Sequence, residues 1–462
     1  MLVDNLQPFP PSFVWGAGTS AYQIEGSADI DGRGPSIWDR FCRTPGNVAG
    51  GGTGDVACDH YRRYRDDVAM MAGLGLDAYR FSISWSRVIP DGTGAVNRPG
   101  LDFYRRLVAE LRDAGIRPFA TLYHWDLPDA LQSRWGGWIG RDTAKAFAEY
   151  ADVVSRALGD EVAAWTTHNE PWVSSWLGYG WGSHPPGYRD LDLGMQASHH
   201  LLLAHGLAIP ALRSNAPRAE VGITLNFSPI VPASTDARDI EAARSADVNI
   251  NRSFIGPLFG IGYDELAIGP VSHALLRSAE DDMRVIQEPI DFLGANYYTR
   301  FLLRDASHPV NPFGEYVEVP GAERTAMGWE VYPDGLLDTL RAVNAVRSDI
   351  KIYVTENGAA YPDVVSDDGK VHDPDRTAYL EAHLAQVARA IGEGIPVAGY
   401  FVWSLLDNFE WTEGYRPRFG IVYVDFETQR RIVKDSAEWY ARTIAAHRAL
   451  APRRPIPPPE MP

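Results

Sequence analysis

The chain has 462 residues, of which 45% are hydrophobic and 22% are charged, so it is long enough for a large buried core. Asp and Glu number 60 against 43 Lys and Arg, and the net charge of −17 argues against nucleic acid and anionic membrane surfaces as partners. Cys42 and Cys58 are too few for a disulfide framework, and we expect reduced thiols in a cytoplasmic protein.

The N-terminal stretch MLVDNLQPFPPSF has neither the basic nor the apolar region of a signal peptide, and no later run of about 18 apolar residues predicts a membrane span. Eight shorter runs are near-continuously apolar, as parallel strands are when both faces are covered. These runs are Phe13–Gly18, Ala78–Trp85, Ile116–Tyr123, Ala163–His168, Val221–Phe227, Phe292–Tyr298, Ile352–Thr355 and Val397–Ser404. Between them, apolar residues recur every three or four positions in residues 59–76, 101–111 and 143–158, as the core-facing stripes of helices do.

Eight strands alternating with helices predict a single α/β domain, a (β/α)₈ TIM barrel with elaborated loops at its C-terminal face. An open doubly wound sheet is the alternative, but it needs a Gly-rich phosphate loop after the first strand. The Gly-rich Ala49–Gly54 is not in that position, and we interpret it as a surface loop. We therefore predict one catalytic domain over residues 1–450, followed by a disordered, Pro-rich tail at residues 451–462.

Two of the predicted strands run into a glutamate, Glu170 in THNEP and Glu356 in YVTENG, and each has an Asn neighbour. In a barrel, both carboxylates would point over the same mouth. One glutamate at a strand end most often makes a salt bridge, whereas two together favour the carboxyl pair of glycoside hydrolysis. At about 5 Å and an effective dielectric of about 20, two negative charges repel by roughly 3 kcal/mol, so we expect one carboxyl to stay protonated near neutral pH.

An ordered series of motifs surrounds these two residues. The motifs are FVWGAGTSAYQIEG, RFSISWSRVIP, LYHWDLP, THNEPW, NYYT, YVTENGA and WSLLDNFEW, and they lie between about Phe13 and Phe426. With these motifs in this order, the sequence resembles family 1 glycoside hydrolases, the β-glucosidase family. The resemblance implies a retaining mechanism with Glu356 as nucleophile and Glu170 as acid/base. It implies no metal and no cofactor, because carboxylates fill both chemical roles.

By position in these motifs, the resemblance implies further site residues. Those that hold the sugar in the −1 subsite are Gln23, His124, Asn169, Asn296, Glu410 and Trp411. Trp403 resembles the platform beneath the sugar, Phe419 a residue near its O6, and Trp329 an aromatic residue on the aglycone side. Arg80 and Tyr298 resemble the pair that keeps the nucleophile ionised, and Tyr298 also borders the substrate.

The implied substrates are β-glycosides or short β-linked oligosaccharides with terminal non-reducing β-D-glucosyl residues. Side activity on β-galactosides or β-fucosides and some transglycosylation are also implied. A 6-phospho-β-glucosidase is one alternative, but Glu410 would repel the phosphate dianion, which favours the plain sugar. A non-catalytic sugar-binding barrel is another, but such a protein typically lacks one of the two glutamates, and both are present. The preference among these sugars and the oligomeric state stay open.

Three other features have simpler interpretations. His199, His200 and His205 cluster, but their spacing does not place two of them on one helical face as a metal-binding H-E-x-x-H motif does. His168 stands where the family more often has an apolar residue, and we expect it to pack or hydrogen-bond outside the site. The aromatic-rich segment Trp172–Tyr188 either shapes the acceptor side of the site or packs loops on the barrel rim.

Overall fold

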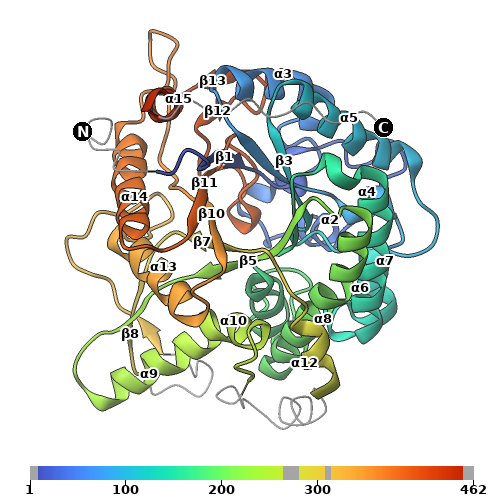
Figure 1. Cartoon of the computed structure of the whole chain (residues 1–462), viewed down its shortest axis with the longest axis horizontal. Helices are drawn as coiled ribbons and strands as arrows, with labels where there is room; N and C mark the ends of the chain where they lie inside the picture. Colours follow the sequence, from blue (N-terminus) through green and yellow to red (C-terminus); the bar gives the residue numbers. More distant parts are fainter. Residues whose placement is uncertain (1–8, 264–279, 307–313, 451–462) are drawn as a thin grey trace.

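The computed structural model of the protein describes residues 9–263, 280–306 and 314–450, so the tail expected at residues 451–462 lies outside the described residues. Its central strands are β1 (Val14–Gly18), β2 (Ala78–Ser82), β3 (Arg117–Tyr123), β4 (Ala164–Asn169), β5 (Glu220–Phe227), β7 (Phe292–Tyr297), β10 (Lys351–Asn357) and β11 (Val397–Trp403). They close into a parallel barrel in the order β1-β11-β10-β7-β5-β4-β3-β2, and helices surround it (Figure 1). Each of the eight predicted runs overlaps one of these strands, although the run Ala78–Trp85 extends past β2 to the first residue of α4, and the TIM barrel is confirmed.

The outer layer is helical, as predicted. Its longer helices are α3 (His60–Gly73), α5 (Arg98–Asp113), α7 (Arg141–Leu158), α8 (Leu191–Asn215), α9 (Ala237–Asp247), α13 (Asp334–Val346), α14 (Pro374–Gly392) and α15 (Asp435–Leu450). Shorter ones are α1 (Ala21–Ile24), α2 (Ile37–Cys42), α4 (Trp85–Val88), α6 (Asp129–Trp135), α10 (Ser253–Leu258) and α12 (Glu280–Ile286). Two small sheets lie outside the barrel, one of β12 (Val422–Val424) and β13 (Arg431–Val433), the other of β6 (Ile230–Pro232), β8 (Phe301–Arg304) and β9 (Glu315–Tyr316). The apolar stripes of α3, α5 and α7 are buried against the core.

The barrel interior is filled by apolar side chains near the N-terminal ends of the strands. One buried cluster contains Val14, Ala78, Phe119, Ala164, Phe292, Tyr353 and Phe401. Its aromatic rings pack edge-on, with the centroids of Phe119 and Tyr353 5.5 Å apart. Close packing of this kind leaves no channel through the barrel. Any open space inside the barrel therefore lies toward the C-terminal ends of the strands.

Irregularities in two strands decide which side chains face the interior. Simple alternation from Ala164 and Thr166 would turn His168 inward. Instead, the register of β4 against β5 shifts between Thr166 and Asn169, so Asn169 faces the interior. His168 is directed outward and stacks on Phe147, with ring centroids 4.5 Å apart. The expectation that His168 packs outside the site is confirmed. A bulge re-aims side chains in this way, and a similar shift in β10 follows Val354.

The barrel closes where the first strand meets the last. β1 pairs with β11 along its whole length, from Val14 opposite Gly399 to Gly18 opposite Trp403. Helix α15 seals this seam, because the hydroxyl of Tyr440 donates to the carbonyl oxygen of Gly16 at 3.0 Å. The first and last strands of the barrel and helix α15 thus meet in one buried region of the fold.

Buried charges tie the loop after β11 to the last helices. The ammonium of Lys434 donates to Asp363 at 2.6 Å and to Asp407 at 2.7 Å. Arg418 donates to Asp407 at 2.7 Å, and Arg376 donates to Asp363 at 2.6 Å. Since a buried charge that loses its partner is strongly destabilising, this network holds the loop in one position.

Other expectations concern small features of the fold. Both Cys42 and Cys58 are free and buried. The Gly-rich Ala49–Gly54 is a loop containing one 3₁₀ turn, and most of its residues are exposed or half-buried. Within the described ranges, none of the helices combines the length and the apolar character needed to cross a membrane.

Helix α8 packs closely against α12 at Gly206, where a Cβ atom would overlap the carbonyl oxygen of Val285. We expect Gly206→Ala to lower the free energy of unfolding by about 1–3 kcal/mol, because overpacking must displace backbone. Gly73 in α3 is the control, since a Cβ there meets nothing within 4 Å. Gly73→Ala should leave stability unchanged or raise it by about 0.5–1 kcal/mol. Denaturant unfolding of both variants measures the difference, and equal effects would contradict the packing argument.

Candidate active site

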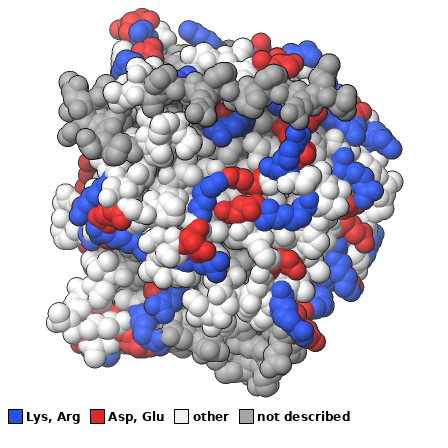
Figure 2. Space-filling model, viewed as in Figure 1, with Lys and Arg blue, Asp and Glu red and all other residues white. Residues whose placement is uncertain are grey.

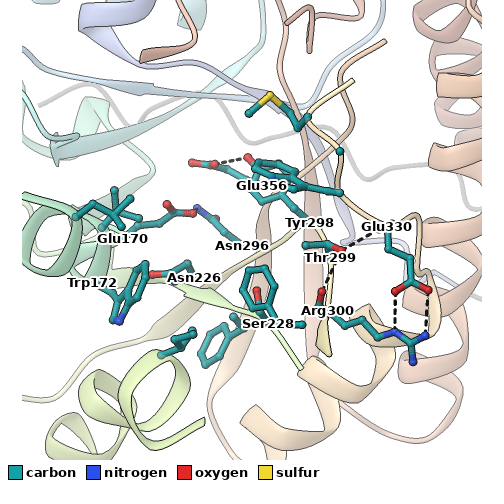
Figure 3. Close-up of a pocket in the computed structure, with 18 of the residues that line it drawn as sticks. Glu170, Trp172, Asn226, Ser228, Asn296, Tyr298, Thr299, Arg300, Glu330 and Glu356 are labelled. Carbon is teal, nitrogen blue, oxygen red and sulfur yellow. Dashed lines mark hydrogen bonds and ion pairs between the residues drawn. The ribbon is translucent and has the colours of Figure 1, made fainter. Parts of the chain in front are cut away.

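A cavity of about 560 Å³ opens at the C-terminal mouth of the barrel. Its lining includes most of the predicted site residues, namely His124, Glu170, Asn296, Tyr298, Trp329, Glu356, Trp403, Glu410, Trp411 and Phe419. Figure 3 shows Glu170 and Glu356 in this cavity, with Asn296 and Tyr298 beside them. The remaining predicted residues, Gln23, Arg80 and Asn169, are buried just behind the lining and hydrogen-bond to it.

Glu356 is held at the inner end of the cavity by two donors. The guanidinium of Arg80 donates to Oε1 at 2.6 Å. The hydroxyl of Tyr298 donates to Oε2 at 2.6 Å (Figure 3). Burial raises the pKa of Glu356, while the positive charge of Arg80 and these hydrogen bonds oppose that shift. Both carboxylate oxygens are therefore fixed, and the cationic donor favours the anionic form of Glu356.

Glu170 lies in a different environment at the end of β4. It accepts one hydrogen bond, from Nδ2 of Asn296 at 2.8 Å. Burial, and then the charge of Glu356, raise its pKa to about 8. Its backbone has a φ of 46°, in the left-handed region that non-glycine residues rarely adopt, and strain of this kind is concentrated at functional sites. The pair is thus unequal, with the proton on Glu170 at neutral pH.

Polar side chains join the two carboxyl groups. Arg80 donates to Oδ1 of Asn169 at 2.5 Å, and Nδ2 of Asn296 donates to the same oxygen at 3.1 Å. The other end of the Asn169 amide lies 3.1 Å from Nε2 of His124. Burial and the nearby Arg80 lower the pKa of His124 well below its usual range, so its imidazole is neutral. These groups form a fixed set of donors and acceptors beside both carboxyls.

A second polar group forms where Gln23 of α1 meets the loop after β11. Nε2 of Gln23 donates to Oδ1 of Asn408 at 3.0 Å and lies 3.5 Å from Oε2 of Glu410. Burial, and then the charge of Glu356, raise the pKa of Glu410 to about 8. The backbone carbonyl of Phe409 also accepts from Gln23, at 2.9 Å. Gln23 and Glu410 are therefore fixed as neighbours, and adjacent hydroxyls of one sugar ring suit such a pair.

Aromatic rings enclose the space between these polar groups. His124 stacks on Trp403 and on Trp411, with ring centroids 5.7 and 6.0 Å apart. Trp403 and Phe419 form a small buried cluster, against which Tyr298, Met327 and Trp329 pack. Flat apolar faces bordered by hydroxyl-binding groups are how proteins hold sugar rings. The cavity has this composition on its inner half.

The outer half of the cavity includes residues that sequence reasoning did not single out. Asn226, Ser228, Arg300 and Glu330 line it, with Trp172 on the side of Glu170 (Figure 3). Arg300 is paired with Glu330 through two hydrogen bonds of 2.9 and 3.0 Å. Asn226, Ser228 and Arg300 lie at or just after the C-terminal ends of β5 and β7. This position is the feature of the sequence that could have identified them as site residues.

Two expectations from the sequence can be compared with the structure of this site. Members of the segment Trp172–Tyr188 line the cavity, so that segment shapes its outer side. The three clustered histidines make separate contacts: His199 with Asp282, His200 with a backbone carbonyl and His205 with Thr167. In the part of the chain that the structure describes, no group of three or more His, Cys, Asp or Glu side chains is placed to hold a metal ion.

The family model for glycosyl hydrolase family 1 matches residues 5–449. The chain belongs to glycosyl hydrolase family 1. It is 49% identical to Beta-glucosidase A of Thermotoga maritima, over 95% of this chain and 98% of that protein. It is 45% identical to the bifunctional beta-D-glucosidase/beta-D-fucosidase of Bifidobacterium breve, over 96% and 99% of the two chains. The solved structure of the family 1 β-glucosidase from Thermotoga maritima matches with a TM-score of 0.92 at 48% identity, covering 96% of this chain and 99% of that one.

The electrostatic coupling in this family 1 site has a direct test. We expect Glu356→Gln to lower the pKa of Glu170 from about 8, because the substitution removes a neighbouring negative charge. Carbon-13 NMR of glutamate side chains, recorded against pH, measures this pKa without catalysis. Glu330→Gln is the control: Glu330 also lines the cavity, but the charges that shift the pKa of Glu170 are those of Glu356, Arg80 and Glu410, so this pKa should move much less. Equal shifts in both variants would contradict the coupling.

Proposed function

We propose that the protein is a retaining β-glucosidase, which hydrolyses terminal non-reducing β-D-glucosyl residues through a covalent glycosyl-enzyme intermediate. The observation that carries this proposal is the unequal carboxyl pair. Arg80 and Tyr298 donate to the two oxygens of Glu356 and favour its anion against the effect of burial, whereas Glu170 has no cationic donor among the described residues and its pKa is raised to about 8. Family membership supports retention, and the β-glucosidase names of the relatives support glucose as the preferred sugar.

In the first step, an oxygen of the Glu356 carboxylate attacks the anomeric carbon of the sugar. The bond from that carbon to the leaving-group oxygen breaks, and the proton of Glu170 moves to that oxygen. Arg80 and Tyr298 fix the orientation of the Glu356 carboxylate, and the carboxylate stays negatively charged and able to attack. Asn169 and Asn296 stand beside both carboxyls, where contacts to the sugar's 2-hydroxyl strengthen as positive charge develops on the ring.

In the second step, a water molecule attacks the anomeric carbon of the ester. Glu170 now takes a proton from the water, and the bond between the sugar and Glu356 breaks, which restores the carboxylate. Esterification removes the charge of Glu356, and that charge is one cause of the raised pKa of Glu170. The pKa of Glu170 therefore falls between the two steps, and the same group becomes a base when a base is needed.

The side chains in the inner half of the cavity bind the sugar. We assign Gln23, Glu410, His124 and Trp411 to its hydroxyls and Trp403 to its ring face. A pair such as Gln23 and Glu410 accepts a 4-hydroxyl in either orientation, which supports side activity on β-galactosides and β-fucosides. The Bifidobacterium breve relative, named for both glucosidase and fucosidase activity, supports this too.

A plain sugar suits this site better than a 6-phosphorylated one. Glu410, whose pKa is raised to about 8, offers a phosphate no positive charge. The arginines that line the cavity are already engaged: Arg300 by Glu330, and Arg324 by the backbone carbonyl of Gly328 at 2.8 Å. Apolar residues of the outer half, such as Trp172, Leu177 and Trp181, accommodate the aglycone or an accepting alcohol, which supports some transglycosylation onto β-linked oligosaccharides. The buried free thiols support a cytoplasmic location.

A covalent trap tests the nucleophile. A 2-deoxy-2-fluoro-β-glucoside with a good leaving group should add one fluoroglucosyl group to Glu356, since fluorine slows both steps and the good leaving group spares only the first. Mass spectrometry of the labelled peptide measures the site. Labelling of another carboxylate, or hydrolysis of aryl β-glucosides without any adduct, would overturn the assignment.

Two different leaving groups test the acid/base role. Glu170→Gln should lower kcat/KM by about 10²–10⁴ on a β-glucoside with a poor leaving group, because the leaving oxygen must then depart unprotonated. A dinitrophenyl β-glucoside needs little protonation, so its first step should change little. The decline of wild-type activity above about pH 8, where Glu170 loses its proton, should disappear in the variant. Equal losses of kcat/KM on both substrates would mean that another group is the acid.

A further inference from the structure

Thr355 lies in β10 directly before Glu356, and its side chain contacts a different strand. Its hydroxyl donates to Oδ1 of Asn296 at 2.7 Å, and both residues are 1% exposed. Gly294 makes this approach possible, because a Cβ atom there would lie only 2.8 Å from Oγ1 of Thr355. The contact therefore depends on the hydroxyl of Thr355 on β10 and on a glycine, Gly294, on β7.

The direction of the hydrogen bonds around Asn296 is set by chemistry. A guanidinium only donates, so the atom of Asn169 that contacts Arg80 is its carbonyl oxygen. The atom of Asn296 that lies 3.1 Å from this oxygen must then be the amide nitrogen, which also donates to Glu170. The opposite end of the Asn296 amide is a carbonyl oxygen, and the hydroxyl of Thr355 is its donor.

We propose that Thr355 is a positioning residue for the hydrolysis, whose hydroxyl holds the Asn296 amide so that its N–H is presented to Glu170. This inference rests on the proposed function. Without the hydroxyl, the buried carbonyl oxygen of Asn296 loses its donor, which is costly in free energy. The amide is then no longer fixed, and its N–H donates less well to the Glu170 carboxylate. Because that hydrogen bond lowers the pKa of Glu170, weakening it keeps Glu170 protonated to higher pH and leaves less of it deprotonated to act as the base of the second step.

In the described part of the chain, none of the other charged and titratable groups around Glu170 hydrogen-bonds to the side chain of Thr355. They are Glu356 on β10, Arg80 on β2, Tyr298 after β7 and Glu410 after β11. A change in the titration of Glu170 therefore reports the orientation of the Asn296 amide rather than a change in the surrounding charge.

Three substitutions at one position isolate the hydroxyl. Thr355→Val keeps the side-chain shape, Thr355→Ala adds no atom that could clash, and Thr355→Ser keeps the hydroxyl. Thr224→Val is the matched control, because Thr224 is on the other side of Gly294 and its buried hydroxyl has no hydrogen-bond partner among the described residues. Thermal unfolding of all four variants verifies that each is folded before kinetics are compared.

We expect Thr355→Val and Thr355→Ala to shift the decline of kcat/KM at high pH to higher pH, measured with an aryl β-glucoside. With a dinitrophenyl β-glucoside, for which the second step limits the rate, kcat should fall about tenfold, the usual effect of losing one hydrogen bond. Thr355→Ser and Thr224→Val should retain the wild-type pH profile and rate. A Ser variant that behaves like Ala, or an Ala variant with the wild-type profile, would overturn the proposal.

A second readout separates this inference from the proposed function. Carbon-13 titration of Glu170 does not require a substrate, so it decides the role of Thr355 even if the wild-type protein hydrolyses no β-glycoside. A higher pKa for Glu170 in Thr355→Ala than in wild type supports the positioning role, and an unchanged pKa overturns it. Absence of β-glycoside hydrolysis in the wild-type protein would overturn the proposed function alone.

Discussion

Two buried carboxyl groups share one cavity, and the structure around them is organised by the repulsion between their charges. Burial disfavours the anion of both Glu170 and Glu356. Arg80 and Tyr298 contact only one of the two, so the negative charge is placed on Glu356 and the proton on Glu170. The difference between a nucleophile and an acid thus comes from the neighbours of two identical side chains.

The barrel supplies the positions that this arrangement needs. Apolar side chains fill the interior near the N-terminal strand ends, and the polar groups lie above them at the C-terminal ends. Shifts of register in β4 and β10 turn the functional face inward at the last residues of those strands. Surface charge is less organised: Figure 2 shows acidic and basic side chains interspersed over one face of the molecule.

Much of the fold follows from local sequence, because apolar runs and helical stripes are read directly from residue type. The two glutamates were also predictable, since a charge at the end of an apolar strand needs an explanation. The bulge in β4 was not, because nothing in the residues of Ala164–Asn169 marks the extra residue that turns Asn169 inward. Thr355 was missed for a related reason. A threonine in a strand is fully explained by strand propensity, and only its contact with Asn296 reveals more.

The seam between β1 and β11 has a consequence for the making of the protein. The first strand to leave the ribosome pairs, on one of its edges, with the last strand of the barrel. At about 5–20 residues per second, that edge waits on the order of tens of seconds for its partner. Until β11 arrives, Trp403 is absent from the cavity and Tyr440 cannot seal the seam. A nascent chain can therefore carry both carboxyl groups and still have no site, and the unpaired edge of β1 is a surface for chaperones to cover.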